Sequence, residues 1–543
     1  MIMHERAGQP AQKEDLINVP ALMAAYYVNE PNPRIREEKV RFGTSGHRGS
    51  ALHKSFNEAH VLAICQAICG YREEHNIKGP LLLGKDTHAL SEAAFITALE
   101  VFIGNGVEVH VQADLGYTPT PVISHEIIKW NREHPKHLAD GVIITPSHNP
   151  PQDGGIKYNP PHGGPADGNV TKVIEKYANA IMSSGLVGVN AVDYDEALNA
   201  RNLIKCDWQK SYVNDLSDVI DFEQIQGANL KIGVNAMGGA GAAYWQAIAD
   251  RYELNMEIMN AHADPAFAFM TLDKDGVIRM DCSSAHAMAG LVAMRDQFDL
   301  AVGNDPDYDR HGIVTPDGLM NSNHFLAVCI DYLLTHRGWQ QKKVGKTVVS
   351  SAMIDRVVNG NQAELFEVPV GFKWFAEELA TEGLVFAGEE SAGASFLDKA
   401  GKAFSTDKDG IILALLAAEI QAVTGKSPST YYAELEAKYG ESFYARLDIK
   451  ATPAMMSAFY HLVKTPPVLN EFAGAADVKV FNRTPGNAAE FGGVKVVTEN
   501  AWFAVRPSGT EPVYKIYAES FVSREHLQQV IAEAQAVVAG WLA

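Results

Sequence analysis

The chain repeats one pattern: an apolar run typical of a β-strand ends in a polar loop, and an apolar stretch with helical spacing follows. The clearest copy spans residues 81–112, where LLLG is followed by KDTHAL, SEAAFITALEVFIGNG and VEVHVQ. Apolar residues at positions 95, 99 and 102 share one helical face, Gly104 and Gly106 mark its end, and Ser91 is expected to cap its start. This order of strand, helix and strand predicts an α/β fold.

The same pattern recurs further along the chain. A second copy contains KIGVNAMGGAGAAYWQAIADRYELNMEIM and FDLAVGNDPDYDRHG, and a third, from about His324, contains TVVSS, a helix after Met353 and LVFAGEESAG. After about Tyr439 the pattern changes to the helical ATPAMMSAFYHLVK, strands around VKVV, WFAVRP and VYKIYAES, and a final helix. We therefore expect three related α/β domains followed by a smaller α+β domain.

A chain of 543 residues is too long for one hydrophobic core, so several domains are required. The expected division is an N-terminal extension, three α/β domains and the α+β domain, at residues 1–39, 40–206, 207–322, 323–438 and 439–543. Residues 1–39 fall outside the motifs below, and the sequence offers no function for them.

Composition narrows the class of protein. No apolar run approaches the roughly 20 residues that cross a bilayer, and the N-terminus lacks the apolar core of a secretory signal, so we expect a cytoplasmic protein. Cys65 and Cys69 lie four apart on an apolar helical stretch, where packing is the expected role. A formal charge of −20 opposes nucleic acid and anionic membranes as partners. An anionic substrate would need particular Arg and Lys residues to hold it.

The loop TPSHNP, at residues 145–150, directly follows the apolar strand-like run GVII. Prolines on both sides restrict the backbone and expose the Ser147 hydroxyl beside His148, at a strand end where open α/β sheets place their ligands. Gly154 and Gly155 then allow the chain to bring Lys157 back toward the serine. The same residues also fit a rigid turn whose serine caps a helix.

The loop NDPDYDRHG carries Asp305, Asp307 and Asp309 at alternate positions after the apolar run FDLAV. Three carboxylates so close repel one another unless a cation lies among them, and all-oxygen ligation suits Mg²⁺. The pattern does not continue as a calcium-binding loop, because Arg310 and Pro316 occupy the positions of its Gly and Glu. A solvated acidic loop is the alternative.

Two further loops carry groups suited to a sugar phosphate. GEESAG, at residues 388–393, offers Glu389 and Ser391 to vicinal hydroxyls, although a helix start would look much the same. RPSGTEP, at residues 506–512, offers a guanidinium, two hydroxyls and free amides to a phosphate, although a tight surface turn has the same composition.

Taken together with GTSGHRG at residues 43–49, GFKW at 371–374 and TDKDG at 406–410, these loops resemble the α-D-phosphohexomutase family in content and order. The resemblance covers nearly the whole chain and is closest to the bacterial glucose-phosphate members. It implies that the four domains surround one central cleft and that each contributes a loop. Val370 departs from members that have Thr there, so a hydroxyl contact at that position is not carried over.

The resemblance also implies a role for each loop. Ser147 would carry a phosphoryl group and, with Asp305, Asp307 and Asp309, hold Mg²⁺. The expected charged surroundings of the transferring group are Arg48, His148, Lys157, Arg310 and Lys408. The expected substrate-binding residues are Gly371, Lys373, Glu389 and Ser391 for the sugar, and Arg506, Ser508, Gly509 and Thr510 for the phosphate that is not reacting.

The implied activity is the interconversion of glucose 1-phosphate and glucose 6-phosphate through glucose 1,6-bisphosphate, which turns around within the cleft. Phosphoryl transfer mainly requires positioning and charge neutralisation, which a proline-stiffened loop beside a metal and several cations supplies. His148 and Lys157 are the candidate bases for Ser147. The alternatives are a mutase for mannose or glucosamine phosphates, a phosphatase, and a non-catalytic phosphosugar-binding protein. The expected form is a monomer or a homodimer.

Overall fold

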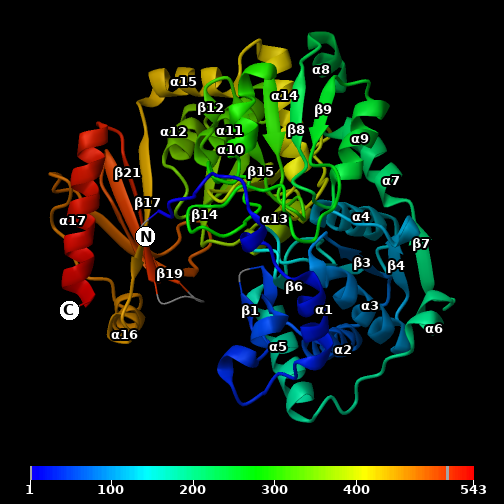
Figure 1. Cartoon of the computed structure of the whole chain (residues 1–543). Coiled ribbons are helices and arrows are strands. Elements are labelled where there is room, and N and C mark those ends of the chain that lie inside the picture. Colours follow the sequence, from blue (N-terminus) through cyan, green and yellow to red (C-terminus); the bar gives the residue numbers. More distant parts are fainter. Residues whose placement is uncertain (1–2, 44, 509–512, 543) are drawn as a thin grey trace.

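The computed structural model of the chain describes residues 3–43, 45–508 and 513–542, and these form four β-sheets with helices packed around them (Figure 1). The first sheet has the strand order β1-β2-β6-β5-β3-β4-β7. Its strands are β1 (Phe42–Gly43), β2 (Gly46–Ser50), β3 (Leu81–Lys85), β4 (Val109–Gln112), β5 (Asp140–Ile144), β6 (Asp153–Asn159) and β7 (Leu203–Cys206). Its helices are α1 (Val19–Val28), α2 (Glu58–Glu74), α3 (Ala89–Gly104), α4 (Thr120–Glu133), α5 (Gly168–Ser183) and α6 (Tyr194–Leu198).

The second and third sheets have the orders β12-β11-β10-β8-β9 and β14-β13-β15-β16. The elements of the second are α7 (Trp208–Asp215), α8 (Phe222–Ala228), β8 (Ile232–Asn235), α9 (Ala242–Arg251), β9 (Met256–Met259), α10 (Ala289–Ala293), β10 (Leu300–Gly303), β11 (Gly312–Thr315) and β12 (Gly318–Leu319). Those of the third are α11 (Ser322–His336), β13 (Lys343–Thr347), α12 (Met353–Gly360), β14 (Glu364–Val368), α13 (Ala376–Ala380), β15 (Phe386–Glu389), β16 (Gly393–Phe396), α14 (Gly410–Thr424) and α15 (Pro428–Tyr439).

The three sheets share one four-strand unit. In each, the first strand of the unit lies between the second and third as parallel neighbours, and the fourth returns antiparallel to the third: β3, β4, β5 and β6; β8, β9, β10 and β11; β13, β14, β15 and β16. The turn between the third and fourth strands holds the TPSHNP loop in the first unit, the three aspartates in the second and GEESAG in the third. The unit therefore places three of the predicted loops at equivalent positions.

The fourth sheet is entirely antiparallel, in the order β17-β21-β20-β19-β18, and its orange and red strands lie at one side of the molecule (Figure 1). Its elements are β17 (Phe443–Lys450), α16 (Pro453–Leu462), β18 (Lys479–Arg483), β19 (Glu490–Val497), β20 (Ala501–Pro507), β21 (Val513–Ser520) and α17 (Arg524–Leu542). This confirms the expected fold class of three related α/β domains and a C-terminal α+β domain. The expected domain boundaries stay a prediction.

Packing joins the first three sheets more closely than the fourth. One continuous apolar core contains Leu82 and Ile143 of the first sheet, Ile232 and Val302 of the second, and Val344 and Phe386 of the third. The fourth sheet has a core of its own, with Phe459 of α16 and Val530 of α17. A small cluster that includes Val349 and Trp502 connects it to the third sheet. Residues that come from the first three sheets are therefore held against one another by shared burial.

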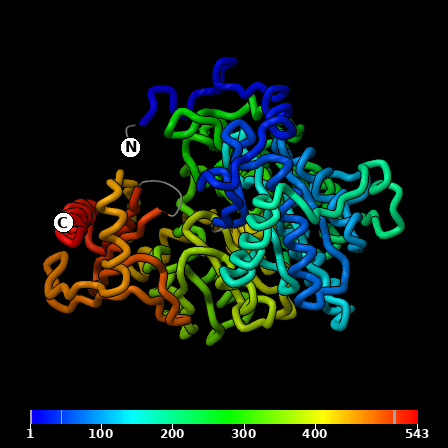
Figure 2. Tube along the Cα trace, turned by 90° about the horizontal axis from the view of Figure 1, so that it is seen from below, coloured from blue at the N-terminus to red at the C-terminus, as the bar shows by residue number. Residues whose placement is uncertain are grey.

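The N-terminal extension packs on two of the sheet units. Residues 4–11 pair with a segment of the second unit: the Gly8 and Ala11 amides donate to the Leu272 and Met270 carbonyl oxygens at 2.8 and 2.9 Å. Figure 2 shows this dark blue segment beside the green one. Further along, α1 packs on α3 of the first unit, where the Tyr26 hydroxyl donates to Thr97 Oγ1 at 3.1 Å. The extension thus connects the first two units.

Several local expectations are corrected or confirmed. Helix α3 begins at Ala89 with His88 at its N-cap, so the expected cap at Ser91 is wrong, because the Ser91 hydroxyl donates to Asp86 instead. Cys65, on α2, is buried in the apolar core of the first sheet unit, as expected from its packing role.

Among the described residues no single helix is long and apolar enough to span a membrane. Only α14 and α15 together reach that length and apolarity, but the pair is bent by 73° and most of α14 is buried.

Candidate active site

Ser147 lies in the turn between β5 and β6 with only 1% of its surface exposed. Its hydroxyl donates to Asp305 Oδ2 at 2.8 Å, and its Oγ lies 3.4 Å from His148 Nδ1. Its backbone φ is +59°, in the left-handed region that few residues other than glycine adopt. Strand β6 follows rather than a helix, so the alternative of a helix-capping serine is wrong. The turn presents one hydroxyl to the acidic loop.

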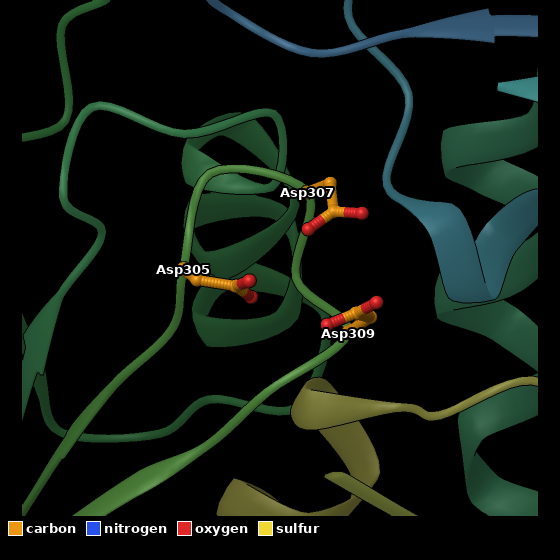
Figure 3. Close-up of side chains that lie close together, drawn as sticks. All are labelled: Asp305, Asp307 and Asp309. Carbon is orange, nitrogen blue, oxygen red and sulfur yellow. The ribbon is translucent and has the colours of Figure 1, made fainter. Parts of the chain in front are cut away.

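Asp305, Asp307 and Asp309 follow β10 and converge from one loop (Figure 3). All three are buried, which excludes a solvated acidic loop, and one carboxylate oxygen from each lies within 4.8 Å of the others. In the part of the chain that the structure describes, the Oδ1 atoms of Asp307 and Asp309 are buried without a hydrogen-bond partner. Burial, and then the two neighbouring carboxylates, raise the pKa of Asp305 well above its usual value. The group therefore fits a hard metal ion, which would satisfy the two oxygens and relieve the repulsion.

Two lysines from other parts of the fold reach this group, one from strand β6 and one from the segment between β16 and α14. Lys157 Nζ on β6 lies 2.5 Å from Asp307 Oδ2 and 2.9 Å from Asp309 Oδ2, and Lys408 Nζ lies 3.0 Å from Asp309 Oδ2. Burial alone would raise the pKa of Asp309, but the two lysines and Arg310 hold it well below its usual value. The carboxylates in turn raise the pKa of both lysines despite their burial. Both lysines are therefore charged in this arrangement.

The candidate bases differ in protonation. Burial, and then the nearby Arg310 charge, lower the pKa of His148 to about 3, so its imidazole is neutral and is a weak base in this arrangement. Lys157 is charged and cannot accept a proton.

Two arginines also lie near the carboxylates and the serine loop. Arg310 lies 3.8 Å from Asp281 and 3.9 Å from Asp309, and Arg48 donates to Asn149 Oδ1, in the serine loop, at 3.4 Å.

The third loop is a hairpin turn between β15 and β16, so the alternative of a helix start is wrong. Glu389 Oε1 accepts a hydrogen bond from the Gly371 amide at 2.9 Å, which joins GEESAG to GFKW. Burial raises the pKa of Glu389 to about 7. Ser391 is partly exposed in the same turn. The Lys373 amine lies beside Gly168, at the start of α5.

The fourth loop is described only in part. Arg506 is partly exposed near the end of β20, and its buried Nε has no hydrogen-bond partner among the described residues. Ser508 begins the loop, and its amide donates to the Val513 carbonyl oxygen at 2.8 Å. Gly509 and Thr510 lie outside the described residues. The expected phosphate site therefore stays a prediction.

Sequence reasoning missed several residues that contact the group. Thr120, at the start of α4, donates from its amide to the Asp307 carbonyl oxygen and from its hydroxyl to Asp307 Oδ2, at 2.9 and 2.7 Å. Asp281 lies beside Arg310. Asp407 precedes Lys408 and lines, with Lys157 and Lys408, a pocket beside the group. The run TPTP at residues 118–121, where α4 begins, was a usable signal for Thr120, whereas nothing in the stretch RMDCSS distinguishes Asp281.

The chain matches the phosphoglucomutase/phosphomannomutase family models for alpha/beta/alpha domain I at residues 39–184, domain II at 210–318 and domain III at 321–439, and for the C-terminal domain at 464–537. It is 52% identical over 540 residues to a phosphoglucomutase of Komagataeibacter xylinus, covering 99% of this chain and 97% of that one. Phosphoglucomutase 2 of Saccharomyces cerevisiae is 24% identical, covering 91% of this chain and 93% of its own length. The open form of the Paramecium phosphoglucomutase parafusin superposes with a TM-score of 0.73 at 19% identity, covering 95% of this chain and 96% of that one.

Proposed function

This chain belongs to the phosphoglucomutase/phosphomannomutase family, and we propose that it interconverts α-D-glucose 1-phosphate and D-glucose 6-phosphate through a phosphoserine at Ser147. The observation that carries the proposal is the buried hydrogen bond from the Ser147 hydroxyl to Asp305, inside a group of three carboxylates and two charged lysines. The 52% identity to a phosphoglucomutase over nearly the whole chain supports glucose as the sugar.

In the forward direction, phosphorylated Ser147 would give its phosphoryl group to the free hydroxyl of the bound sugar phosphate. The Ser147 Oγ–P bond breaks, a bond forms between phosphorus and the sugar oxygen, and the hydroxyl proton passes through a nearby base to the leaving Ser147 Oγ. The product is glucose 1,6-bisphosphate. After it turns around, Ser147 Oγ attacks the other phosphoryl group and the bond from that phosphorus to its sugar oxygen breaks. The Ser147 proton passes through a nearby base, for which neutral His148 is a candidate, to this sugar oxygen, so that phosphoserine is restored and glucose 6-phosphate leaves.

The surroundings suit the charge that is transferred. Asp305, Asp307, Asp309 and a Ser147 phosphoryl oxygen would hold Mg²⁺, which neutralises charge on the transferring group when bound. Lys157, Lys408, Arg310 and Arg48 would add fixed positive charge from four segments of the chain. Because the three aspartates and both lysines are buried, their charges act in a medium of low dielectric constant, where they count for more than in water.

The sugar and its second phosphate require separate contacts. Glu389, Ser391 and the Gly371 and Lys373 segment would bind the hydroxyl groups. Arg506, Ser508, Gly509 and Thr510 would bind the phosphate that is not reacting, in both orientations of the bisphosphate. We also propose that the protein acts in the cytoplasm as a monomer or homodimer, without nucleic-acid or membrane partners, in keeping with its charge of −20.

Assays of glucose, mannose and glucosamine 1-phosphates side by side test this function, with inorganic phosphate measured in the same samples. The expected result is the highest kcat/KM for glucose 1-phosphate, with glucose 6-phosphate formed and no stoichiometric release of phosphate. A higher kcat/KM for another sugar would reassign the substrate within the family. Release of one inorganic phosphate per sugar would identify a phosphatase instead.

A further inference from the structure

The Ser147 loop has a backbone conformation that it does not favour by itself. The φ of +59° at Ser147 is uncommon for any residue with a side chain, and such conformations persist where the surroundings hold them. Ser147 Oγ reaches Asp305 only while this turn is maintained. Two loops of the chain meet here: the serine loop after β5 and the KDTHAL loop after β3, at the ends of neighbouring parallel strands.

Asp86, in the KDTHAL loop, is fully buried and holds the first half of the serine loop. Its Oδ2 accepts a hydrogen bond from Thr145 Oγ1 at 2.6 Å, and Thr145 Oγ1 accepts one from the Ser147 amide at 2.8 Å. Asp86 Oδ1 accepts from the Ser91 hydroxyl at 2.6 Å and from the His88 amide at 3.0 Å. A buried carboxylate that accepts from these three donors is a rigid anchor, and one of the three leads directly to the Ser147 backbone.

His88 holds the second half of the loop. It is buried, its Nδ1 lies 2.8 Å from Asp86 Oδ2, and its Nε2 lies 3.0 Å from the Asn149 carbonyl oxygen. A carboxylate and a carbonyl can only accept, so both ring nitrogens must donate and the imidazole is an imidazolium. Burial alone would lower the pKa of His88, but the Asp86 charge raises it, in agreement with the geometry. The Phe267 ring, from the second sheet unit, covers this imidazole at 5.0 Å between ring centroids.

We propose that Asp86 and His88 are positioning residues for phosphoryl transfer, which hold Ser147 in its left-handed turn through Thr145 on one side and Asn149 on the other. The inference depends on the proposed function, because it takes Ser147 as the phosphoryl carrier. Neither residue touches the transferring group. Their contribution is to keep Ser147 Oγ aimed at the carboxylate group, a requirement that affects the chemical step more than substrate binding.

The bond from Thr145 is tested by Thr145→Val, which keeps the shape of the side chain and removes the hydroxyl. We expect kcat to fall at least about tenfold with KM within about twofold of wild type, and phosphorylation of Ser147 by glucose 1,6-bisphosphate, followed by mass spectrometry, to slow by the same factor. Thr145→Ser should restore most of both rates. A kcat for Thr145→Val within about twofold of wild type would overturn the proposal.

Thr97→Val is the matched control for a purely structural effect. Thr97 is buried in α3, and its hydroxyl likewise both donates, to the Ala93 carbonyl oxygen, and accepts, from Tyr26, at 3.1 Å each. This control should lower the melting temperature as Thr145→Val does and leave kcat unchanged. If kcat fell equally in both variants at equal melting temperature, the effect would be general destabilisation and the proposal would be wrong.

Variants of His88 provide a second test of the proposal, which does not depend on whether Thr145→Val folds. The amide nitrogen of Gln reaches about as far as Nε2 and can still donate to Asn149, whereas that of Asn reaches only as far as Nδ1. We expect kcat to fall less in His88→Gln than in His88→Asn; the reverse order would overturn the role of the Asn149 bond. Turnover by a wild-type protein that never acquires a phosphoryl group on Ser147 would refute the proposed function. If wild-type Ser147 is phosphorylated but Thr145→Val and His88→Asn both keep the wild-type kcat, the positioning role alone is refuted.

Discussion

Gly155→Ala should disable the enzyme without touching any charged group. Gly155 lies on β6, opposite the end of β5. Its carbonyl oxygen accepts a hydrogen bond from the Thr145 amide at 2.8 Å. A Cβ atom at this position would lie 2.3 Å from the Thr145 carbonyl oxygen and 2.9 Å from Pro146 Cα. Both are backbone atoms, so no side-chain rotation can relieve the contact.

The size of the effect follows from these distances. Ordinary contacts would require the Thr145 and Pro146 backbone to move by about 1 Å, and Ser147 follows directly in the chain. Misplacement of a reacting group by about 1 Å can lower a rate about a hundredfold. We therefore expect kcat to fall about 30- to 100-fold, with a loss of about 1–3 kcal/mol in the free energy of unfolding.

The assay is steady-state conversion of saturating glucose 1-phosphate, with thermal unfolding measured on the same samples. Gly70→Ala is the control, because Gly70 lies within α2 and a Cβ there meets nothing within 4 Å. That variant should keep kcat and gain about 0.5–1 kcal/mol of stability. A Gly155→Ala variant with kcat within about twofold of wild type would refute the claim that the backbone of this loop sets the reaction geometry.

The remaining predictions concern the metal, Glu389 and Arg506. Chelation should abolish turnover and Mg²⁺ should restore turnover and raise the melting temperature; full activity in a verified metal-free sample would contradict the assignment of the three aspartates. The folded-state pKa of Glu389, about 7, exceeds its usual value of 4.5, so the unfolded chain loses this proton first and stability falls as pH rises from about 4.5 to about 7, then stays at the lower level. Glu389→Gln should therefore raise the melting temperature at about pH 8, with a gain that shrinks toward pH 4.5. A gain independent of pH would show that Glu389 is not the titrating group. Arg506→Ala should lower kcat/KM for both sugar phosphates about ten- to a hundredfold and increase release of glucose 1,6-bisphosphate, and a loss for only one substrate would exclude a shared phosphate site.

The sequence predicted the repeated fold and three of the loops well, for a physical reason. Buried strands such as β5 and β10 are short apolar runs, and the polar residues that follow them must lie where the sheet ends. Local spacing therefore marked Ser147 and the three aspartates as candidates, whereas their roles were predicted from the resemblance to the family. Local spacing also misled: Ser91 is a residue type that often caps helices, but its hydroxyl donates a hydrogen bond to the Asp86 carboxylate instead.

The contacts that sequence reasoning missed join distant parts of the chain. Thr120 meets Asp307 across 187 positions, and Thr145 meets Asp86 across 59. Each of these residues is an ordinary Thr or Asp in its own segment, and its role appears only when the two sheets or strands are adjacent. The N-terminal extension is a similar case, because its bonds to Met270 and Leu272 depend on the placement of the second sheet unit.

The proposed activity depends most directly on Ser147 as the phosphoryl carrier. Purified protein equilibrated with glucose 1,6-bisphosphate should gain the mass of one phosphoryl group, peptide mapping should locate it on Ser147, and addition of glucose 1-phosphate should remove and restore it within a turnover. Ser147→Ala should gain no phosphoryl group and lose nearly all activity while still binding sugar phosphates. A phosphoryl group on another residue, or near-normal turnover by Ser147→Ala, would contradict the account.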